Sequence, residues 1–431
     1  MLSFEPRVVI VDDKYNEISG ILEQYQKNGI GIKYYNANLN DSDPKPSTHF
    51  SDLNLIFLDV HFTENFADYD PTHCAAWIDS LVPEYSFYIL VLWSKETDKK
   101  DEILEELKKI NKEPFLFFAE QKTDYQTQNS WDFDRLNDSI NSQLDNYPEL
   151  DELSIWKKSI LNSSNIVIGH LSNNIDNDAL RKKLQKIIIG HGGEYLLGSN
   201  KESLKREVLF DALDNILSSN SKVTRPNQAV SQTNKENLYD IPTFPTTDID
   251  SKLNSWFHFK LIESSFEPNF ITSGLISFFK NDSLKKNYSL LNDENVTKYL
   301  RYHLNAVENK PEISDIAVII SRPCDLAQNK FGRNLKLLSG LLIKKPLRNT
   351  SHKFKGKDTK PLSMKVYDHL SLSKEETDCA LIFDFRYTFS LPPNIFEERF
   401  EKIKVFNKEL LSEIQVEYSS YSSRLGITQI L

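Results

Sequence analysis

The chain has 431 residues, a net charge of −10, 39% hydrophobic and 26% charged residues, which leaves room for two or three folded domains and excludes a chain dominated by structureless tracts. No apolar run reaches the roughly 18 residues of a membrane-spanning helix, and the N-terminus lacks the basic and apolar regions of a signal peptide. The three cysteines, Cys74, Cys324 and Cys379, are widely spaced and fit neither a disulfide framework nor a zinc site. We therefore expect a cytoplasmic protein without a membrane segment.

The first predicted strand ends in two adjacent carboxylates. The β-branched run Val8–Val11 is typical of a strand buried on both faces, as parallel sheets require, and Asp12 and Asp13 follow it. A helix is predicted over Tyr15–Asn28, with Gly29 just beyond it. In an open α/β sheet ligands gather at the carboxyl ends of the strands, so the acid pair is placed to share a cation. A solvated turn is the alternative.

Three later apolar runs also end near a polar side chain. They are Leu53–Leu58 before Asp59, Phe87–Trp93 before Ser94, and Phe115–Ala119, with Lys122 three residues further on. A parallel sheet would bring these groups and the acid pair to one edge. Helices predicted between and after the strands cover Ala75–Leu81, Glu96–Asn111 and Trp131–Leu144.

This set of side chains suits phosphoryl transfer to a carboxylate. A divalent metal would be bound by Asp12, Asp13 and Asp59. Asp59 would be the nucleophile, and Ser94 and Lys122 would hold the oxygens of the incoming phosphoryl group.

Residues 1–147 resemble the receiver domain of two-component response regulators, which has a flavodoxin-like (βα)5 fold. The acid pair, the phosphoacceptor at Asp59, the hydroxyl at Ser94 and the lysine at Lys122 occur in the family's order and approximate spacing. The resemblance implies that Mg²⁺ binds at the acid pair. It also implies that Asp59 receives a phosphoryl group from a histidine-kinase-like ATPase.

The sequence departs from this family at three places. The segment Val60–Glu64 lacks the usual Met-Pro turn and glycine after the phosphoacceptor. Thr123 follows the lysine where the family has a proline, and Ala119 stands where it has an aromatic residue. These departures leave open a pseudo-receiver that keeps its acids as a protein-docking rim.

The next two segments differ in composition. Residues 148–220 repeat apolar positions with helical period, which predicts a helical linker or bundle that could also join two copies of the chain. The turn Gly190–Gly193 follows a predicted helix and lacks the Lys-Ser/Thr of a phosphate-binding loop, so we interpret it as a helix-ending turn. Residues 221–250 are rich in Ser, Asn, Thr, Gln and Pro and predict a loop or linker.

Residues 251–431 predict an α+β domain built on a small barrel or curled sheet. Short apolar runs favour strands, and longer periodic stretches favour helices. The strands are expected at Phe257–Ile262, Ile271–Phe279, Ile316–Ile320, Leu335–Ile343 and Ala380–Phe385, and the helices at Val296–Val307 and Ile395–Tyr421.

A basic stretch lies within this domain. Residues 328–365 contain eleven Lys and Arg against one acidic residue, Asp358. Lys344, Lys345, Arg348 and Lys353 are therefore candidates for contacts with nucleic acid or an acidic protein. A solvated loop, or a surface that docks on the protein's own acidic N-terminal part, explains the same charge.

A second motif, Cys324 with Asp325, follows a predicted strand. Lys330 stands where a phosphatase loop would carry an arginine, so a reactive thiol is disfavoured. Together with Arg424 near the C-terminus, the motif loosely resembles an uncharacterised domain of bacterial phage-defence and conflict operons. The resemblance brings no known activity, but such domains occur beside receiver-like domains and ATPases of the histidine-kinase type.

The leading hypothesis is a response-regulator-like signalling protein, in bacterial anti-phage defence, rather than a turnover enzyme. Its receiver would accept a phosphoryl group on Asp59 and control the C-terminal output domain. The alternative is a pseudo-receiver adaptor in a defence complex, with the basic stretch as its docking surface.

Overall fold

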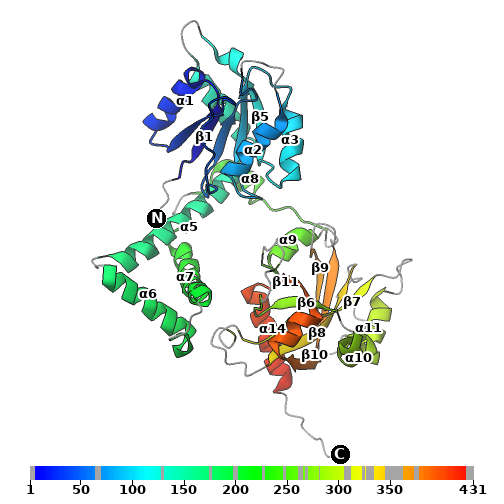
Figure 1. The fold of residues 1–431 in the computed structure, drawn as a ribbon. Helices are drawn as coiled ribbons and strands as arrows, with labels where there is room; N and C mark the ends of the chain where they lie inside the picture. Colours follow the sequence, from blue (N-terminus) through cyan, green and yellow to red (C-terminus); the bar gives the residue numbers. More distant parts are fainter. Residues whose placement is uncertain are drawn as a thin grey trace, which may run out of the picture. The chain divides into compact units, whose positions relative to one another are not determined.

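The computed structural model describes residues 5–63, 69–127, 131–173, 177–197, 202–225, 229–245, 249–260, 266, 270–280, 282–304, 312–322, 326, 334–344, 363–372 and 378–423. The chain divides into two compact units, Met1–Glu152 and Leu153–Leu431. The first is built on a parallel sheet and the second contains an antiparallel one (Figure 1). In the described part of the chain, no helix is both long and apolar enough to cross a membrane.

The first unit is a five-stranded parallel sheet in the order β2-β1-β3-β4-β5. The strands are β1 (Val8–Asp12), β2 (Ile32–Asn36), β3 (Leu55–Leu58), β4 (Ile89–Ser94) and β5 (Leu116–Gln121). The four strands predicted from apolar runs are confirmed. The position of β2 was not predicted, because this strand mixes polar and apolar residues and has one buried position, Tyr35.

Both faces of this sheet are covered, which explains the uninterrupted apolar runs. Val8 and Ile10 of β1 pack beneath α1 (Tyr15–Lys27) and α4 (Phe133–Leu144). Val9 and Val11 point to the opposite face, beneath α2 (Pro71–Leu81) and α3 (Lys100–Lys109). The carboxylates of Asp70 and Asp132 accept backbone N–H groups at the starts of α2 and α4 and so fix where these helices begin.

One helix of the expected (βα)5 pattern is missing, and this part of the prediction is wrong. Residues 37–54, all described, form an irregular connection from β2 to β3. The side-chain oxygens of Asn36 and Asn38 accept the N–H groups of Asn38 and Asn40, and Asp43 accepts the N–H of Asn36. Such local bonds compete with the hydrogen bonds of a helix, and Pro44 adds to the effect.

The helical segment predicted over 148–220 begins at the end of the first unit and continues into the second. Its helices are α5 (Glu149–Ser172), α6 (Asn177–Gly192) and α7 (Glu202–Val223). Gly193 has a φ of +86° and donates its N–H to the carbonyl of Ile189, so the glycine turn ends α6 as predicted. Within the expected linker, residues 232–237 instead form a helix, α8 (Gln232–Asn237), capped by the Ser231 hydroxyl.

The rest of this unit is a six-stranded antiparallel sheet in the order β11-β6-β7-β8-β10-β9. Its strands are β6 (Leu275–Phe279), β7 (Ile313–Ile319), β8 (Leu335–Ile343), β9 (Met364–Leu370), β10 (Cys379–Leu391) and β11 (Phe400–Val405). The described strands form an open sheet with β11 and β9 at its edges, rather than a closed barrel.

Helices cover both faces of the antiparallel sheet. One face packs against α14 (Lys408–Ser422), and the other against α10 (Asp282–Tyr288), α11 (Glu294–Leu304) and α13 (Pro393–Arg399). This burial accounts for the fully buried runs of β7, β8 and β10.

Two expected elements of this region are wrong, and β9 was not predicted. Residues 257–262 were expected to form a strand, but the described part, 257–260, follows a short helix, α9 (Ser251–Trp256), and makes a single bridge, from Phe259 to Phe406. The long helix predicted over 395–421 is broken by β11, which pairs with β6. Asn407 then caps α14 by accepting the N–H of Leu410 at 2.8 Å.

Gly340 allows a close approach of two strands, which yields a stability prediction. A Cβ at this position would lie 2.6 Å from Phe383 Cδ1 and 2.7 Å from the Ile382 carbonyl oxygen. Gly340→Ala should therefore lower the free energy of unfolding by about 1–3 kcal/mol, because β8 is paired on both sides and cannot shift easily. Urea denaturation of the full chain measures the change.

Ser339→Ala is the matched control. The Ser339 hydroxyl is buried and has no hydrogen-bond partner among the described residues, so its removal should change stability by less than about 0.5 kcal/mol. Equal effects of the two substitutions would contradict the close approach at Gly340.

Candidate functional site

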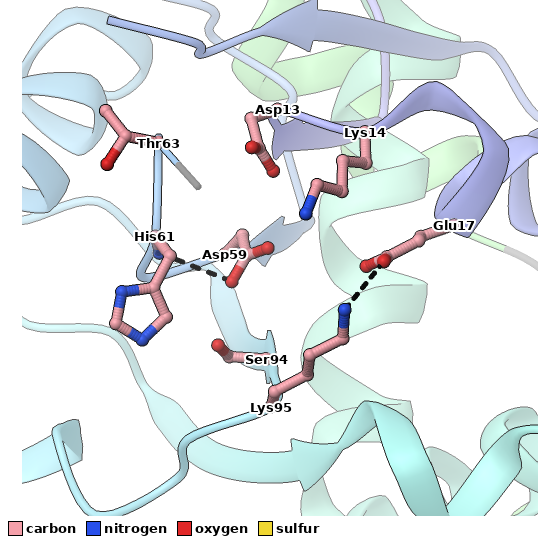
Figure 2. A pocket seen from close by; sticks show the side chains of 8 residues that line it. All are labelled: Asp13, Lys14, Glu17, Asp59, His61, Thr63, Ser94 and Lys95. Carbon is pink, nitrogen blue, oxygen red and sulfur yellow. Dashed lines mark hydrogen bonds and ion pairs between the residues drawn. The ribbon is translucent and has the colours of Figure 1, made fainter. Parts of the chain in front are cut away.

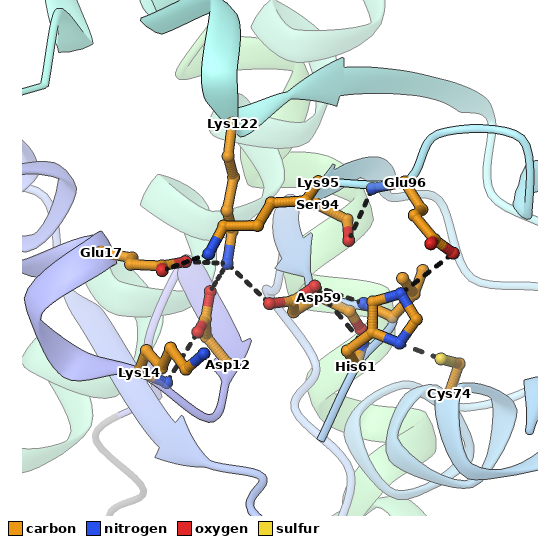
Figure 3. A network of polar contacts seen from close by, with 11 residues as sticks. Asp12, Lys14, Glu17, Asp59, His61, Cys74, Ser94, Lys95, Glu96 and Lys122 are labelled. Carbon is orange, nitrogen blue, oxygen red and sulfur yellow. Dashed lines mark hydrogen bonds and ion pairs between the residues drawn. The ribbon is translucent and has the colours of Figure 1, made fainter. Parts of the chain in front are cut away.

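Four strand ends of the parallel sheet lie level with one another. Asp12 is the last residue of β1, Asp59 directly follows β3, Ser94 is the last residue of β4 and Lys122 directly follows β5. The register pairs Leu58 of β3 with residues in both neighbouring strands. Because parallel strands end at the same edge, side chains far apart in the sequence meet there (Figure 3).

The Lys122 ammonium group lies at the centre of this site. Its Nζ is 2.7 Å from Asp12 Oδ2, 2.6 Å from Asp59 Oδ2 and 2.9 Å from Glu17 Oε2. Lys122 and Asp12 are fully buried, and Asp59 and Glu17 are 6% and 8% exposed. A buried ammonium group is stable here because three carboxylates surround it.

Glu17 is the functional residue that was not predicted from the sequence. It lies in the first turn of α1, one helical turn after Asp13, and is not at a strand end. Packing of Ile18 and Ile21 against the sheet turns this part of the helix toward the site. The feature of the sequence that could have identified Glu17 is that this carboxylate comes one helical turn after the acid pair. Lys95, next to Ser94, binds the other oxygen of Glu17 with Nζ 2.9 Å from Oε1.

Asp59 has donors on both of its carboxylate oxygens. Oδ1 accepts the N–H of Val60 at 2.7 Å and that of His61 at 3.4 Å, while Oδ2 faces Lys122. Its side chain also borders a small cavity that opens to solvent (Figure 2). The cavity is lined by Asp13, Lys14, Glu17, Asp59, His61, Thr63, Ser94 and Lys95. A small anion could therefore reach Asp59 and the Ser94 hydroxyl from the same side.

Burial perturbs the acids of the site. Burial and the charge of Asp59 together raise the pKa of Asp12 to about 7, although Lys122 acts in the opposite direction. Burial, with a smaller effect of Asp59, also raises the pKa of Asp13. These carboxylates bind a proton more readily than ordinary aspartates, as expected where acids outnumber their cationic partners.

Lys122 shifts the pKa of Glu17 toward the charged form, and the two aspartates do the same for Lys122. Burial acts to raise the pKa of Glu17, but hydrogen bonds and charges from Lys122 and Lys95 outweigh it, and the pKa is lowered. Burial acts to lower the pKa of Lys122, but Asp59 and Asp12 outweigh it and raise that pKa. Glu17 and Lys122 are therefore a true ion pair rather than a neutral contact.

The acids could hold a divalent cation, because carboxylate oxygens are the donors that such ions prefer. Asp12, Glu17 and Asp59 each offer an oxygen within 4.8 Å of the others. The Lys122 ammonium group lies among these same oxygens, whereas Asp13 borders the open cavity beside Asp59. Glu17 lines the same cavity, whereas Asp12 does not, and Asp13 is not one of the three acids that lie close together, so the expected set of Asp12, Asp13 and Asp59 stays a prediction.

Of the other candidate residues, the structure describes Lys344 alone. Lys344 is in the second unit, where its Nζ lies 3.2 Å from Glu312 Oε2. Lys345, Arg348, Lys353, Cys324, Asp325 and Arg424 lie outside the residues that the structure describes. Their predicted roles stay predictions.

The raised pKa of Asp12 predicts a pH dependence of stability without added metal. Between 3.8, its ordinary value, and about 7 the folded protein binds more protons than the unfolded chain. The free energy of unfolding should therefore fall as the pH rises from about 5 to about 7.5, by at most about 2.5 kcal/mol from this group. The lowered pKa of Glu17 acts below its ordinary value of 4.5, outside this range.

Urea denaturation at several pH values in a chelating buffer measures this slope. Asp12→Asn should make it less steep, because the titrating carboxylate is gone. Parallel slopes for the wild type and the variant would contradict the assignment of the titration to Asp12.

Neither the protein-family models nor the curated proteins with which it was compared match it. Any function assigned to the chain therefore rests on the geometry of the site.

Proposed function

We propose that the first unit is a flavodoxin-like receiver that accepts a phosphoryl group on Asp59 and thereby controls the second unit. The supporting observation is the 2.6 Å contact between Lys122 Nζ and Asp59 Oδ2, made beside Asp12 and next to the cavity that Ser94 lines. A nucleophilic carboxylate, an acid pair, a hydroxyl and an ammonium group are the parts that phosphoryl transfer to aspartate requires.

The donor is proposed to be a phosphohistidine on a histidine-kinase-like ATPase. One oxygen of Asp59 attacks the phosphorus atom, the P–N bond to the donor imidazole breaks, and the imidazole nitrogen keeps the electron pair. The product is an acyl phosphate on Asp59. The Lys122 ammonium group and the Ser94 hydroxyl would donate hydrogen bonds to the transferred oxygens and stabilise their charge.

The acid pair has its own part in this proposal. Asp12, Asp13 and Asp59 would hold Mg²⁺, which neutralises charge on the phosphoryl oxygens when bound. In the protein itself, four carboxylates (Asp12, Asp13, Glu17 and Asp59) face three ammonium groups (Lys14, Lys95 and Lys122) around the site. This excess of negative charge attracts a cation to the site and repels any anion other than the phosphoryl group.

A structural change in the first unit would reach the second through the chain that connects them. Helix α4 shares the hydrophobic core of Val8 and Ile10, and α5 begins five residues after α4 ends and runs for 24 residues. A shift of α4 after phosphorylation would therefore be passed to a long helix that leads into the second unit.

The direct test is chemical phosphorylation with acetyl phosphate and Mg²⁺. We expect an acyl phosphate that hydroxylamine removes, seen as an added phosphoryl mass on the intact chain. Asp59→Asn should abolish it, and Ser94→Ala and Lys122→Ala should slow it by roughly tenfold or more, because each removes one contact to the transferred oxygens. A wild-type protein that stays unmodified would exclude the phosphoacceptor function.

Metal binding is tested separately by calorimetric titration with Mg²⁺. Asp13→Asn should weaken binding about tenfold or more, because it removes a charged oxygen ligand on the cavity side. Asp101→Asn, on the exposed first turn of α3, removes the same charge away from the site and should leave the affinity nearly unchanged. If Asp13→Asn binds Mg²⁺ like the wild type while Glu17→Gln does not, the cation uses Glu17 instead.

A further inference from the structure

Glu17 links two lysines that come from different strand ends. Its Oε2 accepts a hydrogen bond from Lys122 and its Oε1 one from Lys95, both at 2.9 Å (Figure 3). The side chain of Lys122 is fully buried, while that of Lys95 is 40% exposed and borders the cavity. The Glu17 carboxylate thus pairs with the buried Lys122 through one oxygen and with the partly exposed Lys95 through the other.

The hydrogen bonds of Lys122 are all in use. An ammonium group has three N–H donors, and those of Lys122 serve Asp12, Glu17 and Asp59. To donate to a phosphoryl oxygen, Lys122 must release one of these carboxylates. A buried carboxylate left without a partner is strongly destabilising, so the one released must have a second cation nearby.

Glu17 meets that requirement through Lys95. Asp12 has one other hydrogen bond, from the N–H of Lys14 at 2.8 Å, which is a backbone donor without a full charge. Asp59 has backbone donors from Val60 and His61. Of these three carboxylates, Glu17 is the one that has a second ammonium group of the protein at hydrogen-bond distance, so Lys122 can leave it without help from a bound cation.

We propose that Glu17 and Lys95 are a positioning pair for the phosphoacceptor site. Glu17 holds Lys122 in the resting protein, and Lys95 keeps Glu17 paired when Lys122 turns toward the phosphoryl group. The inference rests on the proposed function. It assigns no contact with the phosphoryl group to either residue.

The test compares four full-length proteins: the wild type, Lys95→Met, Glu17→Gln and the double variant. Affinity for beryllofluoride, a phosphoryl mimic, is measured in Mg²⁺ by the fluorescence of the protein, in which the buried Trp93 directly precedes Ser94. Lys95→Met should weaken binding by about tenfold or more, because Glu17 would lose its second partner. Glu17→Gln should bind at least as tightly as the wild type.

The double variant decides the mechanism. A neutral amide needs no ammonium partner, so Lys95→Met in the Glu17→Gln background should bind within about threefold of Glu17→Gln alone. Lys108→Met, which removes an exposed lysine paired with Glu105, is the control for loss of one positive charge. If the double variant stays as weak as Lys95→Met, Lys95 contacts the anion itself and the positioning pair is wrong.

Unfolding midpoints of the same proteins without Mg²⁺ and beryllofluoride give a second readout. In this resting state Lys122 still pairs with Glu17, so Lys95→Met should shift the midpoint by no more than about 2 °C. A large loss there would overturn the proposal, because Lys95 would already be needed at rest.

The two proposals can fail separately. A wild-type protein that does not respond to beryllofluoride overturns the phosphoacceptor function and the pair together. A wild-type response with equal affinities in all four proteins overturns the pair alone.

Discussion

The N-terminal site depends on the ammonium group of Lys122. Asp12, Glu17 and Asp59 bring three carboxylates within 3 Å of it, and none of the four side chains is more than slightly exposed. Without the lysine, three buried acids would repel each other or take up protons. With it the pKa of Glu17 is lowered, and the rise that burial causes in the pKa of Asp12 is limited.

The parallel sheet makes this arrangement possible. Its two faces are sealed by α1 with α4 and by α2 with α3, so the strands are held rigidly and their ends stay level. The acids therefore gather at one edge, where the backbone N–H groups of Val60 and His61 also point at Asp59. The missing helix between β2 and β3 leaves this edge intact, because none of the three carboxylates that bind Lys122 comes from β2.

The second unit contains an antiparallel sheet instead of a parallel one. Its antiparallel sheet is covered on both faces, by α14 on one side and by α10, α11 and α13 on the other, so β7, β8 and β10 carry long buried runs. The long connection α5 begins within the first unit and continues into the second. A receiver of the proposed kind needs such a connection, since the chemistry at Asp59 has an effect only if another part of the chain responds.

The sequence by itself determined where most strands of the first unit lie and which four residues stand at their ends. Asp12, Asp59, Ser94 and Lys122 were predictable because parallel strands end at one edge, so a polar residue after an apolar run has a known location. The apolar runs and the periodic spacing of apolar residues were enough to predict these strands and most of the helices.

Only the tertiary structure decided the role of Glu17 and the shape of the C-terminal region. Glu17 comes from a helix, and its direction depends on how α1 packs through Ile18 and Ile21, which no local pattern encodes. The stretch around β11 carries apolar residues at helical spacing, but pairing with β6 turns it into a strand. Local periodicity cannot report such partners, because they lie more than a hundred residues away in the chain and supply their energy only once the sheet has formed.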